Sequence, residues 1–368
     1  MTVVTGGAGA WASFTYEPLP TRVVFGAGTL ARVPEEVDRL GLGAVLVVSS
    51  PGHVGTARDL ARTLGRRSAG VFDGARVHVP APVADAAVQA ADAAGADGCV
   101  AVGGGSAIGL GKAVALRRGL PLVAVPTTYA GSEMTPVWGI TEDGLKRTGR
   151  DVRVLPRSVV YDVDLTLSMP ADLTVTSLFN ALAHAAESLY APDVTPVVAL
   201  LAQAAVRTVA DALPSVLADG GDVAARGDLL RAAWWCGTAL GATTMSLHHK
   251  LCHTLGGTLD LPHAPTHTVL LPHTLAHNLP AAPQAAHALA EALGSDDPAR
   301  ALWDLAGRCG APRSLADLGV ARSDLPRLAE LASTSPYANP RPVTREGVLR
   351  LLEDAWAGRA PAAGEVAG

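Results

Sequence analysis

Histidines are concentrated in one stretch of the chain. The segment HHKLCHTLGGTLDLPHAPTHTVLLPH runs from His248 to His273, and with His277 it holds seven of the eleven histidines within thirty residues. An imidazole can ligate a metal ion, transfer a proton near neutral pH, or lie buried with a hydrogen bond. The spacing of the histidines indicates which of them could act together.

Two pairs of residues four apart predict a site built on helices. Asn180 and His184 lie in NALAH, and His249 and His253 lie in HKLCH. Residues four apart share one face of a helix. His263 follows a Gly-Gly pair that can end the second helix and turn the chain back. Three imidazoles, from His184, His249 and His263, and the amide oxygen of Asn180 could surround one divalent ion as an open Lewis-acid site.

The remaining histidines of this stretch are weaker candidates for a catalytic or metal-binding role. His248, His267, His273 and His277 are expected to serve the structure, by capping helices or bonding to the backbone. Glu187 follows His184 by three residues, which leaves two interpretations open. It is either a hydrogen-bond partner behind a functional histidine or a solvated charge on a helix.

A glycine-rich loop follows a predicted strand in VAVGGGSAIGLGKA. Gly103, Gly104 and Gly105 let the backbone turn sharply and approach a ligand closely, and Ser106 is expected to cap the next helix. The free N–H groups and the positive end of that helix would suit a pyrophosphate. The spacing is neither G-x-G-x-x-G nor a P-loop, so a tight turn without a ligand stays open. A place at the carboxyl end of a central strand favours the ligand.

The loops after two other predicted strands support a dinucleotide site. Thr127 and Thr128 in VPTTYAGSEMT could place hydroxyls beside the same ligand or satisfy the loop backbone. An acid at the end of an early strand usually selects against a 2′-phosphate. Ser49 and Ser50 stand there instead, so we count Ser50 in the nucleotide site. We expect NADPH to be accepted alongside NADH.

Alternating elements must position these loops. AVLVVSS and PLVAVPTT read as buried strands, and VGTARDLARTLG and ADAAVQAADAAG read as helices. Repeated strand–helix units predict a parallel sheet with helices on both faces. After Tyr161 the chain is mostly apolar at helical spacing. We predict a flexible extension over 1–13, an α/β dinucleotide-binding domain over 14–166, and an all-α domain over 167–368.

The bulk composition excludes several classes of protein. The 368 residues are 49% hydrophobic and carry a net charge of −5 with a pI near 6.1, which argues against a nucleic-acid partner. No apolar run reaches the roughly 20 residues of a membrane span, and the N-terminal segment lacks the features of a signal peptide. Four scattered cysteines without a C-x-x-C pair predict a cytoplasmic protein with reduced thiols.

Together these stretches resemble the iron-containing (group III) alcohol dehydrogenases, the superfamily that includes glycerol dehydrogenase and dehydroquinate synthase. The resemblance spans Phe14 to about Pro361 and is strongest to the maleylacetate reductase branch. The segments that carry it are YEPLPTRVVFGAGTLARVPEEV, GGGSAIGLGKA, VPTTYAGSEMTP, LKRTGRDVRVLPRSVVYD, NALAHAAESLYA, HHKLCHTLGGTLDLPHAPTHTVLLPH and YANPRPVTREGV.

The resemblance implies a homodimer whose active site lies in the cleft between the two domains. The family's metal is held by an Asp and three His, which match His184, His249 and His263, with Asn180 at the place of the Asp. Asn at this place is usual in the maleylacetate reductase branch. An amide brings neither charge nor strong affinity for a hard cation. The site therefore either holds Zn²⁺ or Fe²⁺ loosely or uses the histidines directly.

The activity implied by the resemblance is reduction of the conjugated C=C of maleylacetate to 3-oxoadipate by NADH or NADPH, in the degradation of aromatic compounds. Hydride addition β to the ketone would build an enolate, which His184, His249 and His263 would stabilise. His253 matches the family's histidine near the nicotinamide, and it is the predicted proton donor. Tyr337 is added as a catalytic candidate because its loop resembles a cleft-lining segment of the family.

The substrate would be a small oxo-acid with two carboxylates, so cationic or donor side chains should line its site. The candidates are Lys112, Lys250, Tyr129, Tyr337 and Arg341. Two other functions stay open. One is a related reductase acting on another oxo-acid, an aldehyde or an alcohol, including one in a biosynthetic pathway. The other is a non-catalytic nucleotide-binding or metal-sensing protein.

Overall fold

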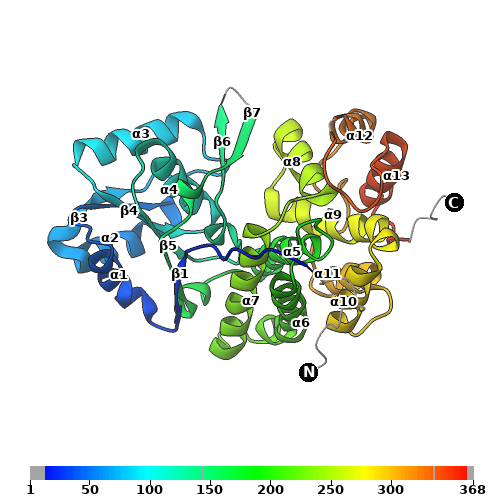
Figure 1. The fold of residues 1–368 in the computed structure, drawn as a ribbon, viewed down its shortest axis with the longest axis horizontal. Coiled ribbons are helices and arrows are strands. Elements are labelled where there is room, and N and C mark those ends of the chain that lie inside the picture. The colour runs from blue at the N-terminus through cyan, green and yellow to red at the C-terminus, as the bar shows by residue number, and fades with distance from the viewer. Residues whose placement is uncertain (1–12, 143–144, 335, 363–368) are drawn as a thin grey trace. The chain divides into compact units, whose positions relative to one another are not determined.

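The computed structural model describes residues 13–142, 145–334 and 336–362. The chain divides into two compact units (Figure 1). The first comprises Leu19–Met169 and Gly221–Leu230, and the second comprises the rest of the chain. The chain thus passes between units at Met169, compared with a predicted boundary near 166. Apart from Ser13, the predicted extension lies outside the described residues.

The first unit is built on a six-stranded parallel sheet in the order β1-β8-β5-β4-β2-β3. The strands and the helices of this unit confirm the predicted α/β class. The strands are β1 Arg22–Gly26, β2 Val45–Ser49, β3 Ser68–Phe72, β4 Gly98–Gly103, β5 Leu122–Pro126 and β8 Ser158–Asp162. The helices are α1 Val33–Arg39, α2 Val54–Leu64, α3 Ala81–Ala93 and α4 Gly105–Arg118.

The sheet follows from short runs of small and β-branched apolar residues. Every residue of β2, β4, β5 and β8 is buried, as expected for strands covered by helices on both faces. Strands β2, β4 and β5 are neighbours and parallel, so the loops that follow them leave the same edge of the sheet. This arrangement brings the loops after Ser49, Gly103 and Pro126 together.

A two-stranded antiparallel hairpin was not among the predicted elements. It consists of β6 Val137–Glu142 and β7 Leu145–Arg150, paired from Val137 with Arg150 to Glu142 with Leu145. Strand β7 is polar and mostly exposed, and Gly139 and Gly149 interrupt both strands. The hydrophobic pattern therefore carries little trace of the hairpin, because one of its strands buries almost nothing.

The second unit is helical, as predicted. Its helices are α5 Ala171–Ser188, α6 Pro196–Ala218, the end of α7 Val223–Gly241, α8 Leu247–Leu259, α9 His263–Asn278, α10 Pro283–Leu293, α11 Pro298–Arg308, α12 Leu325–Ser333 and α13 Arg345–Trp356. Helix α5 is buried along nearly its whole length and packs against α6 and α9, and α8 packs against α9 and α12. Small alanines on α5 allow this close approach, so α5, α8 and α9 form the centre of the unit.

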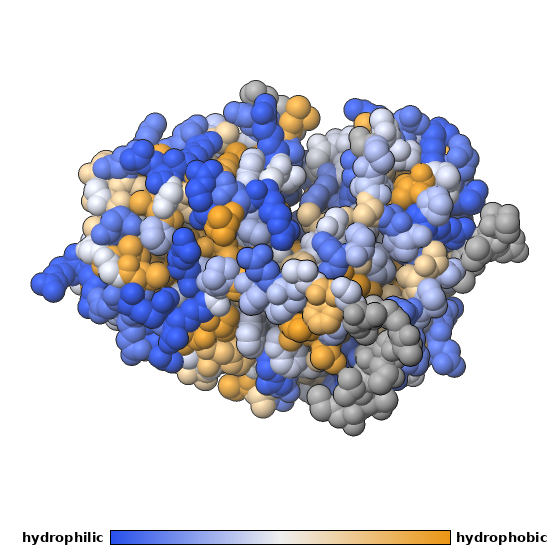
Figure 2. Space-filling model, viewed as in Figure 1, coloured by the Kyte–Doolittle hydropathy of each residue, from blue (hydrophilic) through white to orange (hydrophobic). Residues whose placement is uncertain are grey.

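One helix corrects the expectation that no segment could span a membrane. Helix α6 is 23 residues long and apolar enough to do so by length and composition, but half of its apolar window is buried. It packs on α5 and α10 inside the second unit, and it carries the exposed Arg207 and Asp211. It is a core helix. On the face drawn in Figure 2, hydrophilic and hydrophobic residues are interspersed.

Candidate active site

The glycine loop forms a tight passage from β4 into α4. Helix α4 begins at Gly105 and its N-cap is Gly104, so the expectation that Ser106 caps the helix is wrong; Ser106 is the second helical residue. Gly103 has a φ of 141°, which favours glycine, and a Cβ there would lie 2.9 Å from Cβ of Ala107. The loop therefore requires glycine, and the first N–H groups of α4 are open to an anion.

Polar side chains from the two neighbouring loops meet over this turn. The imidazole of His53 bonds through Nδ1 to Oγ of Ser50 at 3.1 Å and through Nε2 to Oγ1 of Thr127 at 3.0 Å. A Cβ on Gly104 would lie 2.9 Å from Cγ2 of Thr128. Ser50, Gly103, Thr127 and Thr128 are thus brought together. Burial lowers the pKa of His53, which keeps this bridge neutral.

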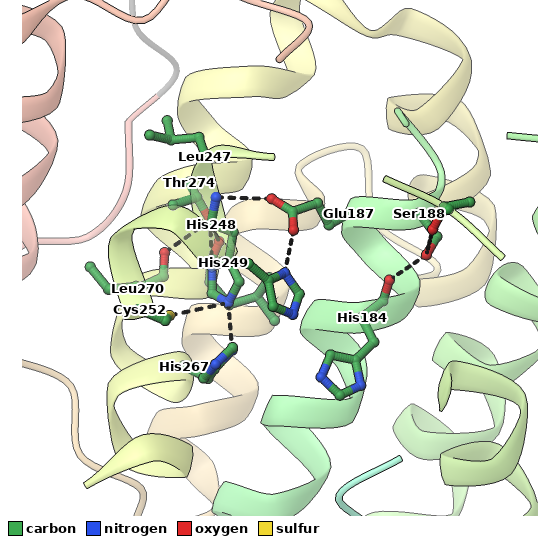
Figure 3. Close-up of polar contacts among 12 residues, drawn as sticks. His184, Glu187, Ser188, Leu247, His248, His249, Cys252, His267, Leu270 and Thr274 are labelled. Atoms are coloured by element: carbon green, nitrogen blue, oxygen red, sulfur yellow. Dashed lines mark hydrogen bonds and ion pairs between the residues drawn. The ribbon is translucent and has the colours of Figure 1, made fainter. Parts of the chain in front are cut away.

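The histidines gather on three helices of the second unit (Figure 3). The figure shows His184 on α5, His249 on α8 and His267 on α9. Helix α5 also carries Asn180, α8 also carries His253, and α9 begins at His263. The side chains of His184 and His249 are each 4% exposed, and their rings stack with centroids 5.3 Å apart. The ring of His253 lies 6.1 Å from that of His249. The helical spacing read from the sequence therefore selected histidines whose rings adjoin one another in the structure.

Glu187 organises the cluster from α5. It is 2% exposed; one carboxylate oxygen accepts a bond from Nδ1–H of His249, and the other accepts the backbone N–H of His248 at 2.9 Å. The structure thus decides between the two interpretations of Glu187: it is a buried hydrogen-bond partner of His249, a predicted site residue, and not a solvated charge. Because Nδ1 of His249 carries the hydrogen, its Nε2 presents a lone pair.

A second chain of hydrogen bonds runs behind the cluster. Nε2 of His248 and Nδ1 of His267 are 2.8 Å apart, and Nδ1 of His248 lies 3.1 Å from Oγ1 of Thr274. Both histidines are completely buried. The sequence assigned them structural roles, but the ring of His267 contacts three predicted site histidines, His184, His249 and His263.

Burial keeps much of the cluster neutral. The pKa values of His184, His248 and His267 are held well below 6.5, first by desolvation and then by the neighbouring histidines. Burial likewise lowers the pKa of His273 and of His277 to about 4. Neutral imidazoles can act as metal ligands or as hydrogen-bonding electrophiles without prior loss of a proton.

The predicted metal ligands fit a metal ion only in part. Nδ1 of His184 and Nε2 of His249 are buried and have no hydrogen-bond partner among the described residues, as open ligand atoms would. Asn180 supplies no charge, so the set suits a borderline ion such as Zn²⁺ better than a hard cation. The ring of His263 contacts those of His253 and His267, and its side chain is exposed.

A different group has the closest ligand atoms. Those of His248, Cys252 and His267 all lie within 4.8 Å of one another, which resembles a His/Cys metal site. However, two imidazole nitrogens bound to one tetrahedral Zn²⁺ would be about 3.3 Å apart, given Zn–N bonds of about 2.0–2.1 Å. The 2.8 Å separation of the His248 and His267 nitrogens is instead that of a hydrogen bond.

Several predicted substrate-binding residues form hydrogen bonds within the protein instead. Lys112 is 2% exposed and donates to the carbonyls of Ser132, Thr135 and Val137, so it does not line an open site as expected. Tyr129 is completely buried and its hydroxyl accepts from Arg226.

Tyr337 and Arg341 also make contacts within the second unit. The ring of Tyr337 packs on the core of this unit, and its hydroxyl donates to the carbonyl of Ala332 at 3.0 Å. The guanidinium of Arg341 donates to the carbonyl of His277 at 3.3 Å. Lys250, on α8, is half-buried.

Two residues of these sites were missed as functional candidates, for different reasons. His53 is a lone histidine after a Pro-Gly turn, and only its position just beyond β2 could have indicated the nucleotide loop. His267 follows His263 by four residues on α9. The spacing that selected the pairs at 180/184 and 249/253 also applied to 263/267, and it was a usable signal.

The fold agrees with comparisons to known proteins. Residues 20–163 match the model of the iron-containing alcohol dehydrogenases, and residues 174–356 match that of the C-terminal region of the same family. The chain belongs to the iron-containing alcohol dehydrogenase family and is an oxidoreductase.

Its relatives within the family include maleylacetate reductases. The maleylacetate reductase of Sphingobium indicum is 52% identical over 348 residues, covering 95% of this chain and 99% of that protein. That of Pseudomonas knackmussii is 50% identical over 351 residues, covering 95% and 100%. The crystal structure of maleylacetate reductase from Rhizobium sp. strain MTP-10005 superposes with a TM-score of 0.91 at 50% identity, covering 95% and 100%.

Proposed function

We propose that this enzyme reduces the conjugated C=C of maleylacetate to 3-oxoadipate with NADH or NADPH, in the degradation of aromatic compounds. The full-length similarity to maleylacetate reductases supports this substrate. The observation that carries the chemistry is the buried cluster of His184 and His249, with His249 fixed by Glu187. It provides a dry, polar site of the kind that stabilises charge developing on a ketone oxygen.

The reaction needs two transfers to carbon. A hydride passes from NAD(P)H to the carbon β to the ketone, and the electrons of the C=C become an enolate. A proton then adds to the carbon between them, which gives 3-oxoadipate and NAD(P)⁺. His184, His249 and His263 would stabilise the oxygen of the enolate. His253, which is half-buried beside His249, would supply the proton.

The nucleotide would lie on the loops of the first unit. The pyrophosphate would bind at Gly103, Gly104, Gly105 and Ser106, with Ser50, Thr127 and Thr128 around it. No carboxylate side chain stands at Ser49 or Ser50 to repel a 2′-phosphate, which favours use of NADPH as well as NADH. A Zn²⁺ or Fe²⁺ ion held by Asn180, His184, His249 and His263 would act as a Lewis acid on the substrate oxygen.

We also propose a cytoplasmic homodimer. The four cysteines are free, and three of them are buried, as suits a reducing compartment. The dimer rests on the family resemblance.

The decisive experiment is oxidation of NADH and NADPH by the purified enzyme with maleylacetate, with 3-oxoadipate identified as the product. Turnover of simple aldehydes or alcohols without turnover of maleylacetate would support a related reductase instead. Nucleotide binding without turnover of any carbonyl or enone would indicate a non-catalytic protein. Full activity after exhaustive chelation would remove the metal from the reaction. His253→Asn should lower turnover roughly 10²-fold, and near-normal turnover would discard His253 as the acid.

A further inference from the structure

The rings of His184, His249 and His267 form a triangle inside the second unit. The ring centroids of His249 and His267 are 5.2 Å apart, and those of His184 and His267 are 6.3 Å apart, compared with 5.3 Å between His184 and His249. All three side chains come from different helices, α5, α8 and α9. The triangle thus places His267, from the same helix as His263, beside the two central histidines.

Each member of the triangle has an open ring nitrogen. Nδ1 of His184 and Nε2 of His249 and His267 are buried and have no hydrogen-bond partner among the residues that the structure describes. A buried polar atom without a partner is unfavourable, so a native site normally supplies one when its ligand binds. The open nitrogens of His184 and His267, on adjoining rings, point to one polar ligand that both share.

We propose that His267 is a further catalytic residue, whose neutral imidazole donates its Nε2–H to the ketone oxygen of the substrate as negative charge develops there. This inference rests on the proposed function. A neutral histidine can serve as such an electrophile without becoming charged. The residue would act as one donor of a preorganised oxyanion site beside His184.

The hydrogen-bond chain behind His267 sets the donating nitrogen. When Oγ1–H of Thr274 donates to Nδ1 of His248, Nε2–H of His248 donates to Nδ1 of His267, and the hydrogen of His267 is on Nε2. Each ring carries one hydrogen. If the Thr274 hydroxyl donates instead to the Leu271 carbonyl, 2.9 Å away, the ring hydrogens move to the other nitrogens. An oxyanion binds well only when Nε2 of His267 carries the hydrogen, so its binding favours the arrangement in which the Thr274 hydroxyl donates to His248. His248 and Thr274 are positioning residues.

The test compares variants of the full-length enzyme in maleylacetate reduction. His267→Leu should lower kcat by about 10²–10³-fold, the effect of losing one oxyanion donor, while the Kd for NADPH stays unchanged. His267→Gln, whose amide can donate, should recover part of kcat. Thr274→Val should lower kcat and Thr274→Ser should retain it. Matched controls are His287→Gln, whose ring is 69% exposed, and Thr238→Val, whose hydroxyl donates to the Trp234 carbonyl. Both controls should keep the wild-type kcat.

A spectroscopic measurement separates this role from a structural one. ¹⁵N NMR of the enzyme with NADP⁺ and 3-oxoadipate should show His267 protonated at Nε2, and Thr274→Val should lose that signal. A His267→Leu enzyme with kcat within threefold of wild type would overturn the inference, and so would protonation at Nδ1 alone. Stoichiometric metal bound by His248, Cys252 and His267 would overturn it as well. An inactive wild type would instead refute the proposed function itself.

Discussion

Replacement of Glu187 by glutamine tests the organisation of the cluster most directly. The variant keeps the volume of the side chain and removes its charge. The amide oxygen can still accept the backbone N–H of His248, which lies 2.9 Å from the carboxylate in the wild type. The amide –NH₂ then faces Nδ1 of His249, so this nitrogen must become an acceptor and the hydrogen of His249 moves to Nε2. The variant therefore reverses the tautomer with little change in shape.

The size of the effect follows from the burial of the pair. Glu187 and His249 are 2% and 4% exposed, so solvent screens their interaction little. A charge-assisted hydrogen bond in such a place contributes about 1.5–3 kcal/mol. At 1.36 kcal/mol for each factor of ten, its loss should lower kcat by about 10–10²-fold. Fold stability should change much less, because removal of a buried charge offsets part of the lost bond.

The assay is single-turnover oxidation of NADPH by excess Glu187→Gln enzyme with maleylacetate, with urea unfolding measured in parallel. Glu187→Asp keeps the charge at a shorter reach and should lie between the wild type and Glu187→Gln. A Glu187→Gln enzyme that turns over within threefold of wild type would show that the tautomer of His249 is not fixed by Glu187, or does not matter. A large loss of stability with the same loss of activity would mean that the variant reports only on folding.

Three further predictions concern the first unit, which we propose binds the nucleotide. Gly103→Ala should raise the Kd for NADPH at least about tenfold, because its φ of 141° and a 2.9 Å contact with Ala107 both oppose a Cβ. Fluorescence titration measures this, and the control is Gly55→Ala on α2, where a Cβ meets nothing within 4 Å. Equal Kd values for the two variants would contradict the loop geometry. Ser50→Asp should lower the ratio of kcat/KM for NADPH to kcat/KM for NADH by tenfold or more, because a carboxylate repels the 2′-phosphate. Ser50→Asn, the control, should leave this ratio unchanged. An unchanged ratio in Ser50→Asp would mean that the 2′ group of the nucleotide binds elsewhere. Burial lowers the pKa of Lys112 to about 7, and the charge of Glu133 opposes this shift. Between pH 7 and about 10.5 the unfolded chain therefore binds one more proton at this residue than the folded chain, so the free energy of unfolding rises with pH by at most about 1.4 kcal/mol per unit. Urea unfolding of Lys112→Met should show a shallower pH dependence than wild type, and parallel curves would refute the depressed pKa.

The sequence by itself determined the class of fold and proposed most of the candidate residues of both sites. Buried β-branched runs separated by helical segments specified a parallel sheet, because only a sheet covered on both faces needs strands without polar positions. The four-residue spacing of Asn180 with His184, and of His249 with His253, predicted shared helix faces, since the helical period is fixed by backbone geometry. The sequence did not predict the hairpin of β6 and β7, because strand β7 buries almost nothing.

Only the tertiary structure decided what each histidine and its neighbours do. Whether Glu187 is solvated or bonded to His249 depends on α5 and α8 both packing against α9, which no local pattern encodes. The same holds for His267, which sequence alone placed among structural residues and which the packing of α9 sets between His184, His249 and His263. Lys112 and Tyr337 carry functional groups that could bind a substrate, yet in the structure both donate hydrogen bonds to backbone carbonyls. Hydrogen-bond partners and burial arise from elements distant in sequence, and they determine which polar groups are left for chemistry.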